Sequence, residues 1–131
     1  MSNAAINVLA VAAGGATGAV ARYWMSAVLY KHFGSGFPYG TLGVNVLGSL
    51  LMGILFVVVV DRPMPDVWRL VLGVGMLGAF TTFSTFSVDT LILVEQGQLL
   101  RALANVFASV VLCLVAVFAG AALARAMLPV G

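Results

Sequence analysis

The stretch that decides the fold is GAFTTFSTFS, residues 78–87, in the middle of the third of four long apolar segments. It begins with a glycine and carries five hydroxyl groups. Backbone that is not helical at membrane depth is tolerated only where protein buries it or where it lines a wet cavity, and glycine with clustered Ser and Thr suits such a break. The alternative is a continuous helix whose hydroxyls bond to carbonyls one turn earlier. The pattern alone leaves both structures open.

The composition around this stretch is that of a membrane protein. The chain has 131 residues, of which 63% are hydrophobic and only 8% are charged, whereas soluble domains carry roughly 25% charged residues. A helical span needs about 20 apolar residues. We therefore predict an all-α membrane protein, a single four-span transmembrane domain over residues 1–131, with spans at about 6–29, 39–60, 67–94 and 99–123.

Several kinds of chemistry are excluded by residue counts. The single cysteine, Cys113, allows no intramolecular disulfide, and with His32 as the only histidine one chain cannot assemble a typical metal-ligand cluster. There is no GxxxxGK[ST] phosphate-binding loop. The net charge of +2 comes from scattered residues, without a basic run that would grip nucleic acid. We expect neither an enzyme nor a nucleic-acid-binding protein.

The distribution of basic residues gives little instruction about orientation in the membrane. Topology follows the Lys and Arg bias of short loops. Here three basic residues lie on the side of the termini and three on or near the other: Arg62, Arg69 and Arg125 against Lys31, Arg101 and Arg22. This balance is compatible with insertion in both orientations and an antiparallel homodimer. The alternative is that one orientation dominates by a small margin.

Polar side chains within apolar spans are costly and mark candidate functional positions. Asn45 lies well inside the second span, where it either makes an interhelical hydrogen bond or binds a ligand. Arg22 cannot lose its charge, so it either snorkels to the membrane surface or supplies a positive field near a pore.

Two further patterns indicate helix faces. Asn105, Ser109 and Cys113 recur every four residues in the fourth span and form one weakly polar stripe, either packing surface or a permeation track. Phe83 and Phe86 share a helix face just after the expected break. They are either apolar filler or ring edges with partial positive charge, which could hold a small anion without a full countercharge. A GxxxG pair in the first span, at residues 14–18, is assigned to close helix packing.

Three ordered pieces carry a family resemblance, namely GGATGAVAR at 14–22, GTLGVN at 40–45, and the stretch at 78–87 with its TTFSTF core. Together they closely resemble the CrcB/Fluc family of fluoride channels over nearly the whole chain. The resemblance implies a fluoride-specific channel that passively exports fluoride across the bacterial inner (plasma) membrane. It also implies an antiparallel, dual-topology homodimer with the third helix broken in mid-membrane, two pores, and a structural sodium ion that is not transported.

The same resemblance implies roles for individual residues. Backbone carbonyls of Gly78 and Thr81 from both subunits would coordinate sodium. Ring edges of Phe83 and Phe86 would face fluoride in the pore. The other pore residues would be the donors Asn45 and Ser109, together with Thr41, Arg22, Thr82 and Ser84.

Two positions depart from the family pattern. Cys113 stands where the family often has a hydroxyl residue, and a thiol is a weaker hydrogen-bond donor. Asp89 stands where the family often has glutamate, and its side chain reaches less far. The selectivity elements remain in both cases.

Two rival functions come from other classes. A small multidrug-resistance-type, proton-coupled exporter is also a short four-span dimer, but it needs a carboxylate buried within a span. Here Asp61, Asp66 and Glu95 fall in or beside loops, and Asp89 lies towards the end of the third span. The other rival is a non-transporting assembly subunit. Passive fluoride efflux, proton-linked cation exchange, or no flux from liposomes would separate the three.

Overall fold

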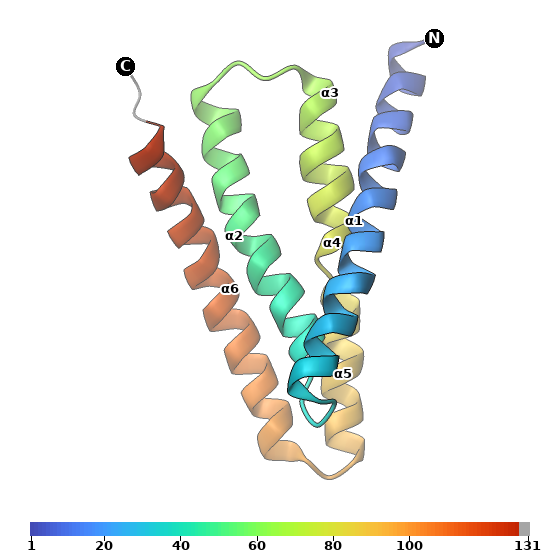
Figure 1. Cartoon of the computed structure of the whole chain (residues 1–131), viewed down its shortest axis with the longest axis vertical. Helices are drawn as coiled ribbons and strands as arrows, with labels where there is room; N and C mark the ends of the chain where they lie inside the picture. Colours follow the sequence, from blue (N-terminus) through green and yellow to red (C-terminus); the bar gives the residue numbers. More distant parts are fainter. Residues whose placement is uncertain (129–131) are drawn as a thin grey trace.

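The computed structural model describes residues 1–128 as helices joined by short turns (Figure 1). Four segments are long and apolar enough to cross a membrane: Asn3–Phe33, Tyr39–Asp61, Asp66–Glu95 and Leu99–Met127. The predicted all-α architecture of four long apolar helices is therefore confirmed. The proposed domain also includes residues 129–131, which lie outside the described part of the chain.

The third segment differs from the other three because it is not one regular helix. Three segments are continuous α-helices: α1 (Asn3–Phe33), α2 (Tyr39–Asp61) and α6 (Leu99–Met127). The third is built from α3 (Asp66–Arg69), a π-helix η1 (Leu70–Leu77), α4 (Gly78–Phe80) and α5 (Phe83–Glu95). The π-helix was not predicted, and π-helical segments often occur at functional sites.

The end of α1 lies further along the chain than predicted. The first span is predicted to end near residue 29, but the helix continues to Phe33. Lys31 and His32 occupy its last turn, where a positive charge is favoured by the negative end of the helix dipole. The helix ends at Gly34, whose φ of 83° is readily adopted only by glycine.

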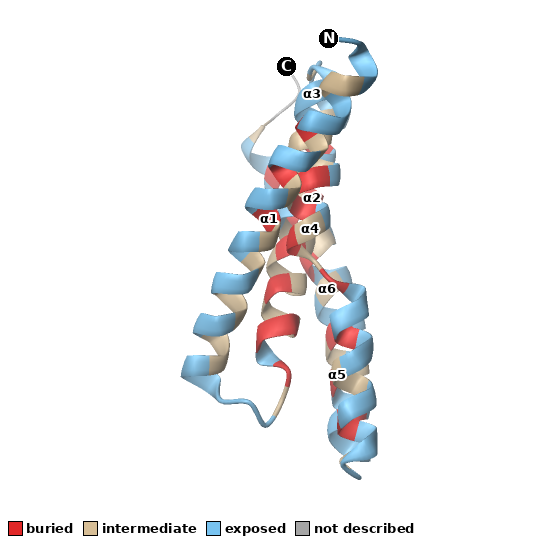
Figure 2. Ribbon diagram, turned by 90° about the vertical axis from the view of Figure 1, so that its right-hand side faces the viewer, coloured by how far each residue is buried: buried red, intermediate tan, exposed pale blue. Residues whose placement is uncertain are grey.

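The helices form two closely packed pairs. α2 packs along α6, and α1 packs along η1. In Figure 1 the helices diverge towards the end where α1 begins and α6 finishes, and Figure 2 shows that the other end of α1 lies apart from α5 and α6. A small buried cluster of Val57, Ala121 and Ala124, with Ile54 against it, joins α2 to α6.

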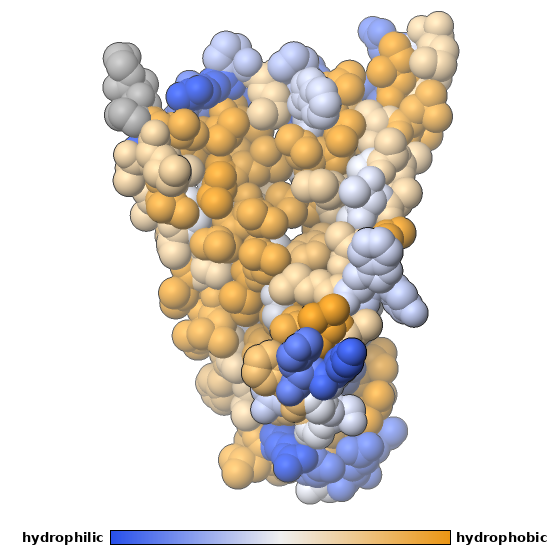
Figure 3. Space-filling view, in the orientation of Figure 1, coloured by the Kyte–Doolittle hydropathy of each residue, from blue (hydrophilic) through white to orange (hydrophobic). Residues whose placement is uncertain are grey.

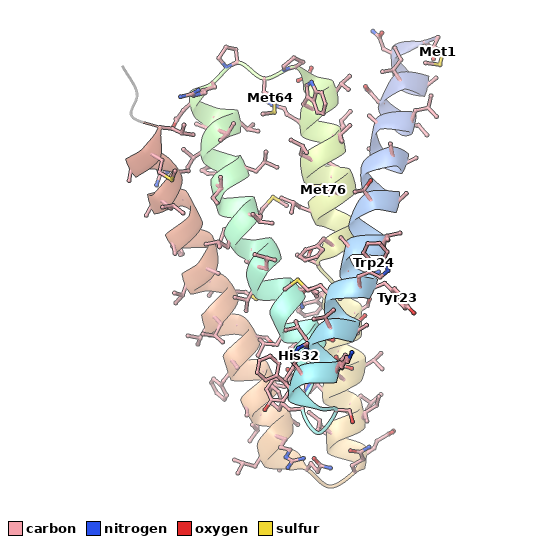
Figure 4. All side chains as sticks on the ribbon, in the orientation of Figure 1. Met1, Tyr23, Trp24, His32, Met64 and Met76 are labelled. Carbon is pink, nitrogen blue, oxygen red and sulfur yellow. The ribbon has the colours of Figure 1, made fainter. Side chains whose placement is uncertain are left out.

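Most large apolar side chains point outwards. Buried residues lie along the lines where helices meet, while the outer faces are exposed (Figure 2). The face drawn in Figure 3 is hydrophobic over its middle, with hydrophilic residues at its upper rim and its lower end. On α1, Tyr23 and Trp24 project away from the bundle (Figure 4) and are 72% and 67% exposed. Such a surface suits hydrocarbon surroundings rather than water.

The pair formed by α1 and η1 is held by very close backbone packing. A Cβ atom at Gly14 would overlap the carbonyl oxygen of Val71, and one at Gly18 would overlap that of Met76. From the other side, a Cβ at Gly75 would lie 2.8 Å from a carbonyl oxygen of α1. The GxxxG pair therefore serves the close helix contact that its spacing predicts.

Candidate functional site

The third segment is interrupted between α4 and α5. Thr81 (φ −82°, ψ 157°) and Thr82 (φ −153°, ψ 113°) have extended backbone, and the helix resumes at Phe83. The break that the family resemblance implies is therefore present, and it comprises Thr81 and Thr82 alone within the stretch 78–87. Gly78 itself is helical, with φ −62° and ψ −37°.

The side chain of Asn45 on α2 fixes this break. Its Oδ1 accepts a hydrogen bond from the Thr82 N–H at 2.7 Å, and its Nδ2 donates to the Thr82 carbonyl at 3.0 Å. One amide thus pairs with both backbone groups of a residue that has left the helix. Thr82 is only 8% exposed, and unpaired backbone groups at such a site would be costly. Of the two roles that the sequence leaves open for Asn45, the structure shows a hydrogen bond between segments.

The hydroxyl of Thr82 caps the helix that follows the break. Its Oγ1 accepts from the N–H of Thr85 at 3.2 Å and bonds to the Thr85 hydroxyl at 3.0 Å. The Ser84 hydroxyl lies 3.4 Å from the same atom. A threonine at this position satisfies an otherwise free donor at the start of a helix. Part of the hydroxyl cluster therefore has a structural use.

A groove of about 490 Å³ opens beside the break. Its walls come from α2, the break, α5 and α6, and its lining side chains are all uncharged. Thr81, a sodium-site candidate, is one of the lining residues. Six others are also named in the sequence analysis, as pore candidates or as members of the α6 stripe: Asn45, Thr82, Phe83, Phe86, Ser109 and Cys113. The groove therefore combines amide, hydroxyl and thiol groups with aromatic rings.

The two phenylalanines of the groove differ in burial. Their ring centroids are 5.2 Å apart and the ring planes meet at 48°, a tilted arrangement that presents ring edges. Phe86 is 9% exposed, whereas Phe83 is 79% exposed. Phe86 therefore belongs to the wall of the bundle, and Phe83 projects from it.

A chain of hydrogen bonds leads from the groove into the contact between α5 and α6. The Ser109 hydroxyl lies 3.5 Å from Asn105 Oδ1, Asn105 Nδ2 donates to Thr90 Oγ1 at 3.0 Å, and Thr90 Oγ1 donates to the Phe86 carbonyl at 2.8 Å. Asn105 is 1% exposed. The stripe on α6 therefore faces the protein, and it connects a groove hydroxyl to the backbone of a groove phenylalanine.

Thr90 was not found by the sequence analysis. A single threonine in an apolar helix is usually explained by a bond to the carbonyl one turn earlier, which Thr90 also makes. Its second contact, with Asn105, depends on how α5 meets α6, and a single sequence does not specify that.

Three of the pore residues that the family resemblance implies do not line the groove. The Thr41 hydroxyl donates to Asp89 Oδ2 at 2.6 Å, which links α2 to α5 outside the groove. Arg22 on α1 is partly exposed, and Ser84 is exposed beside the break. The groove thus gathers the residues nearest the break and leaves these three at other positions.

The backbone at the break suits a hard cation such as sodium. In a continuous helix the Gly78 carbonyl would accept from the N–H of Thr82, but that N–H is bonded to Asn45. The residue that follows α4, Thr81, has extended backbone, so its carbonyl has left the helical alignment. Carbonyl oxygens are the kind of ligand that such cations prefer. The two residues therefore fit the ion that the family resemblance implies.

These features define a multi-pass membrane protein with an interrupted third span and an uncharged groove beside the interruption. The family described as CrcB-like protein, Camphor Resistance (CrcB), matches residues 9–121. The chain belongs to this family, as the three sequence pieces predicted.

Its relatives carry the name of a channel rather than an enzyme. The fluoride-specific ion channel FluC of Methylococcus capsulatus is 54% identical over 92% of this chain, which spans about half (53%) of that relative's length. The protein of the same name from Shewanella amazonensis is 51% identical over 87% of this chain and 92% of its own length. That of Magnetococcus marinus is 50% identical over 88% of this chain and 94% of its own.

Proposed function

We propose that this protein is a fluoride-specific ion channel that passively exports fluoride and lowers its cytoplasmic concentration. Family membership and the names of the relatives support this function. The observation that carries it is the groove beside the break, where an amide, hydroxyls and two phenylalanine rings converge without a charged side chain.

The composition of the groove suits a small anion that must leave as easily as it enters. A full positive charge would hold the ion too tightly for fast exit. Ring edges of Phe83 and Phe86 provide weaker positive potential. Asn45 uses one Nδ2 hydrogen on Thr82 and keeps a second, and Ser109 adds a hydroxyl. Cys113 continues this track as a weaker donor.

The working unit is an antiparallel homodimer. The exposed ring of Phe83 and the open groove leave a surface that a second copy would cover. The balance of basic residues is compatible with insertion in both orientations. Carbonyls of Gly78 and Thr81 from the two breaks would hold a structural sodium ion. The bound ion would supply a fixed positive charge that joins the two subunits.

The remaining candidate residues would contribute to the same fluoride pore. Thr82 and Ser84 offer hydroxyls at the start of α5, close to the groove. Thr41 would act through its hydrogen bond to Asp89. Arg22 would provide a positive field at the approach to the pore.

A fluoride-electrode assay tests this function. The purified protein is reconstituted into liposomes loaded with potassium fluoride. Valinomycin is added to carry potassium out, so that no membrane potential builds up against fluoride efflux. Rapid fluoride efflux with no chloride efflux under the same conditions is the expected result. Fluxes that need a proton gradient, or liposomes that stay loaded, would refute the proposal.

A further inference from the structure

Arg101 continues the polar stripe of α6 to the end of the helix. Arg101, Asn105 and Ser109 are spaced by four residues, so they lie along one face. Ser109 lines the groove, and Asn105 is the buried residue bonded to it. Arg101 is the exposed, charged member near the start of α6, and Figure 3 shows that this end of the molecule is hydrophilic.

The positive charge of Arg101 does not stabilise α6 at this position. Arg101 is the third residue of the helix, which begins at Leu99. The N-terminal end of a helix carries partial positive charge and favours acidic side chains. The guanidinium therefore adds to the positive potential of this end instead of offsetting it.

The guanidinium is nevertheless held in place. Arg101 Nη1 donates to the Gly36 carbonyl at 3.0 Å and to Gln98 Oε1 at 2.9 Å. Both acceptors are uncharged, and the structure gives Arg101 no ion pair within residues 1–128. Its full charge is therefore fixed beside the loop that leads into α2.

Charged side chains of both signs are also found towards this end of the molecule, where Lys31 occupies the last turn of α1. Asp89, bonded to Thr41 near the start of α2, and Glu95 at the end of α5 belong to the same end of the molecule. Their carboxylates would repel a small anion that leaves or enters the stripe on this side.

We propose that Arg101 attracts fluoride to this mouth of the pore by offsetting the carboxylates of Asp89 and Glu95. This inference rests on the proposed channel function. A fixed cation raises the local concentration of anions and the rate at which they enter. For one charge about 10 Å from the ion in water, Coulomb's law gives an effect of about twofold on the rate.

Salt dependence separates attraction from a structural role. Arg101→Gln removes the charge and keeps a donor for the Gly36 carbonyl, while Arg101→Lys keeps the charge. The matched control is Arg62→Gln, which removes an exposed arginine at the other end of α2. Single-channel fluoride current is measured at an ionic strength of about 0.01 M and again at about 1 M, where the screening length falls from about 30 Å to about 3 Å.

We expect Arg101→Gln to conduct about half as well as the unmodified protein at low ionic strength and equally well at high ionic strength. Arg101→Lys and Arg62→Gln should match the unmodified protein in both. Equal currents at low ionic strength, or a loss that persists at high ionic strength, would overturn the role of Arg101. Absence of fluoride current in the unmodified protein would instead overturn the channel function itself.

A second measurement remains available if Arg101→Gln does not fold. Arg101→Cys in a Cys113→Ser background can be modified after reconstitution with a cationic or an anionic thiol reagent of similar size. The cationic reagent should give the larger low-salt current. Equal currents after the two modifications would contradict the proposal.

Discussion

The side-chain amide of Asn45 bonds to both backbone groups of Thr82, although 37 residues separate them in the sequence. The pair ties the continuous helix α2 to the only two extended residues within the third segment as the structure describes it. Because both residues line the groove, the same contact that stabilises the break also shapes the site.

The first prediction concerns this contact. Asn45→Leu should lower the thermal stability of the purified protein and abolish fluoride efflux, because it leaves the N–H and carbonyl of Thr82 without partners. Each unpaired buried group costs about 1–3 kcal/mol. Ser49→Ala is the matched control, since Ser49 lines the same groove one turn further along α2. If Asn45→Leu were as stable as Ser49→Ala, the bonding role would be wrong.

The second prediction concerns the close packing of α1 on η1. Gly18→Ala should destabilise the protein, because the new Cβ overlaps the Met76 carbonyl oxygen and the helices must separate. Overpacking of this kind costs about 1–3 kcal/mol. Gly15→Ala lies on the same helix with no neighbouring atom within 4 Å, so it should be neutral or stabilising. Thermal unfolding in detergent compares the two variants, and equal unfolding temperatures would contradict the close packing of α1 on η1.

How far the sequence predicts this fold depends on the range of the interactions involved. The cluster of glycine and hydroxyl residues at 78–87 leaves both a break and a continuous helix open, and only the family resemblance implies the break. The four apolar helices follow from hydropathy. The π-helical stretch Leu70–Leu77 does not, because it depends on a shift in backbone hydrogen bonding that its side chains do not specify. α1 continues past the predicted end near residue 29 because a basic side chain such as Lys31 is favourable in the last turn of a helix.

The residues of the candidate site also divide into those that the sequence identifies and those that it does not. Phe83, Phe86, Asn45 and Ser109 were identified as polar or aromatic exceptions within apolar helices, and the groove brings them together. Their partners could not be identified in this way. The bond from Asn105 to Thr90 joins two helices whose relative rotation is set by tertiary packing.

The third prediction concerns sodium. If backbone carbonyls at Gly78 and Thr81 hold the ion, replacing sodium by a bulky organic cation should lower stability or activity without any sodium flux coupled to fluoride. Thr81→Val should keep this sodium dependence, because it removes the hydroxyl that bonds to Leu77 and retains the carbonyl. Radioactive sodium uptake measures the flux, and stoichiometric transport of sodium with fluoride would contradict a structural ion.

The fourth prediction concerns orientation in the membrane. Because basic residues are balanced between the two sides, single cysteines placed in one loop of a Cys113→Ser background should be labelled from both sides of the membrane. Adding two lysines to the loop between α2 and α3 should fix one orientation and reduce fluoride efflux. Labelling of the unmodified loops from one side alone would rule out dual insertion.

The last prediction concerns the two phenylalanines. Phe83→Ile and Phe86→Ile keep apolar bulk and delete the ring edge. If the rings were only packing, the exchanges would cost under about 1.5 kcal/mol and leave transport largely intact. If the ring edges hold fluoride, efflux should collapse in either variant.

Phe83 is the sharper test, because its ring is 79% exposed in the single chain, so Ile at this position removes little packing within the subunit. Both variants must still elute as dimers in size-exclusion chromatography, which excludes misassembly as the cause. Near-normal fluoride efflux from liposomes that carry the double variant would refute the ring-edge mechanism and leave the membrane architecture unaffected.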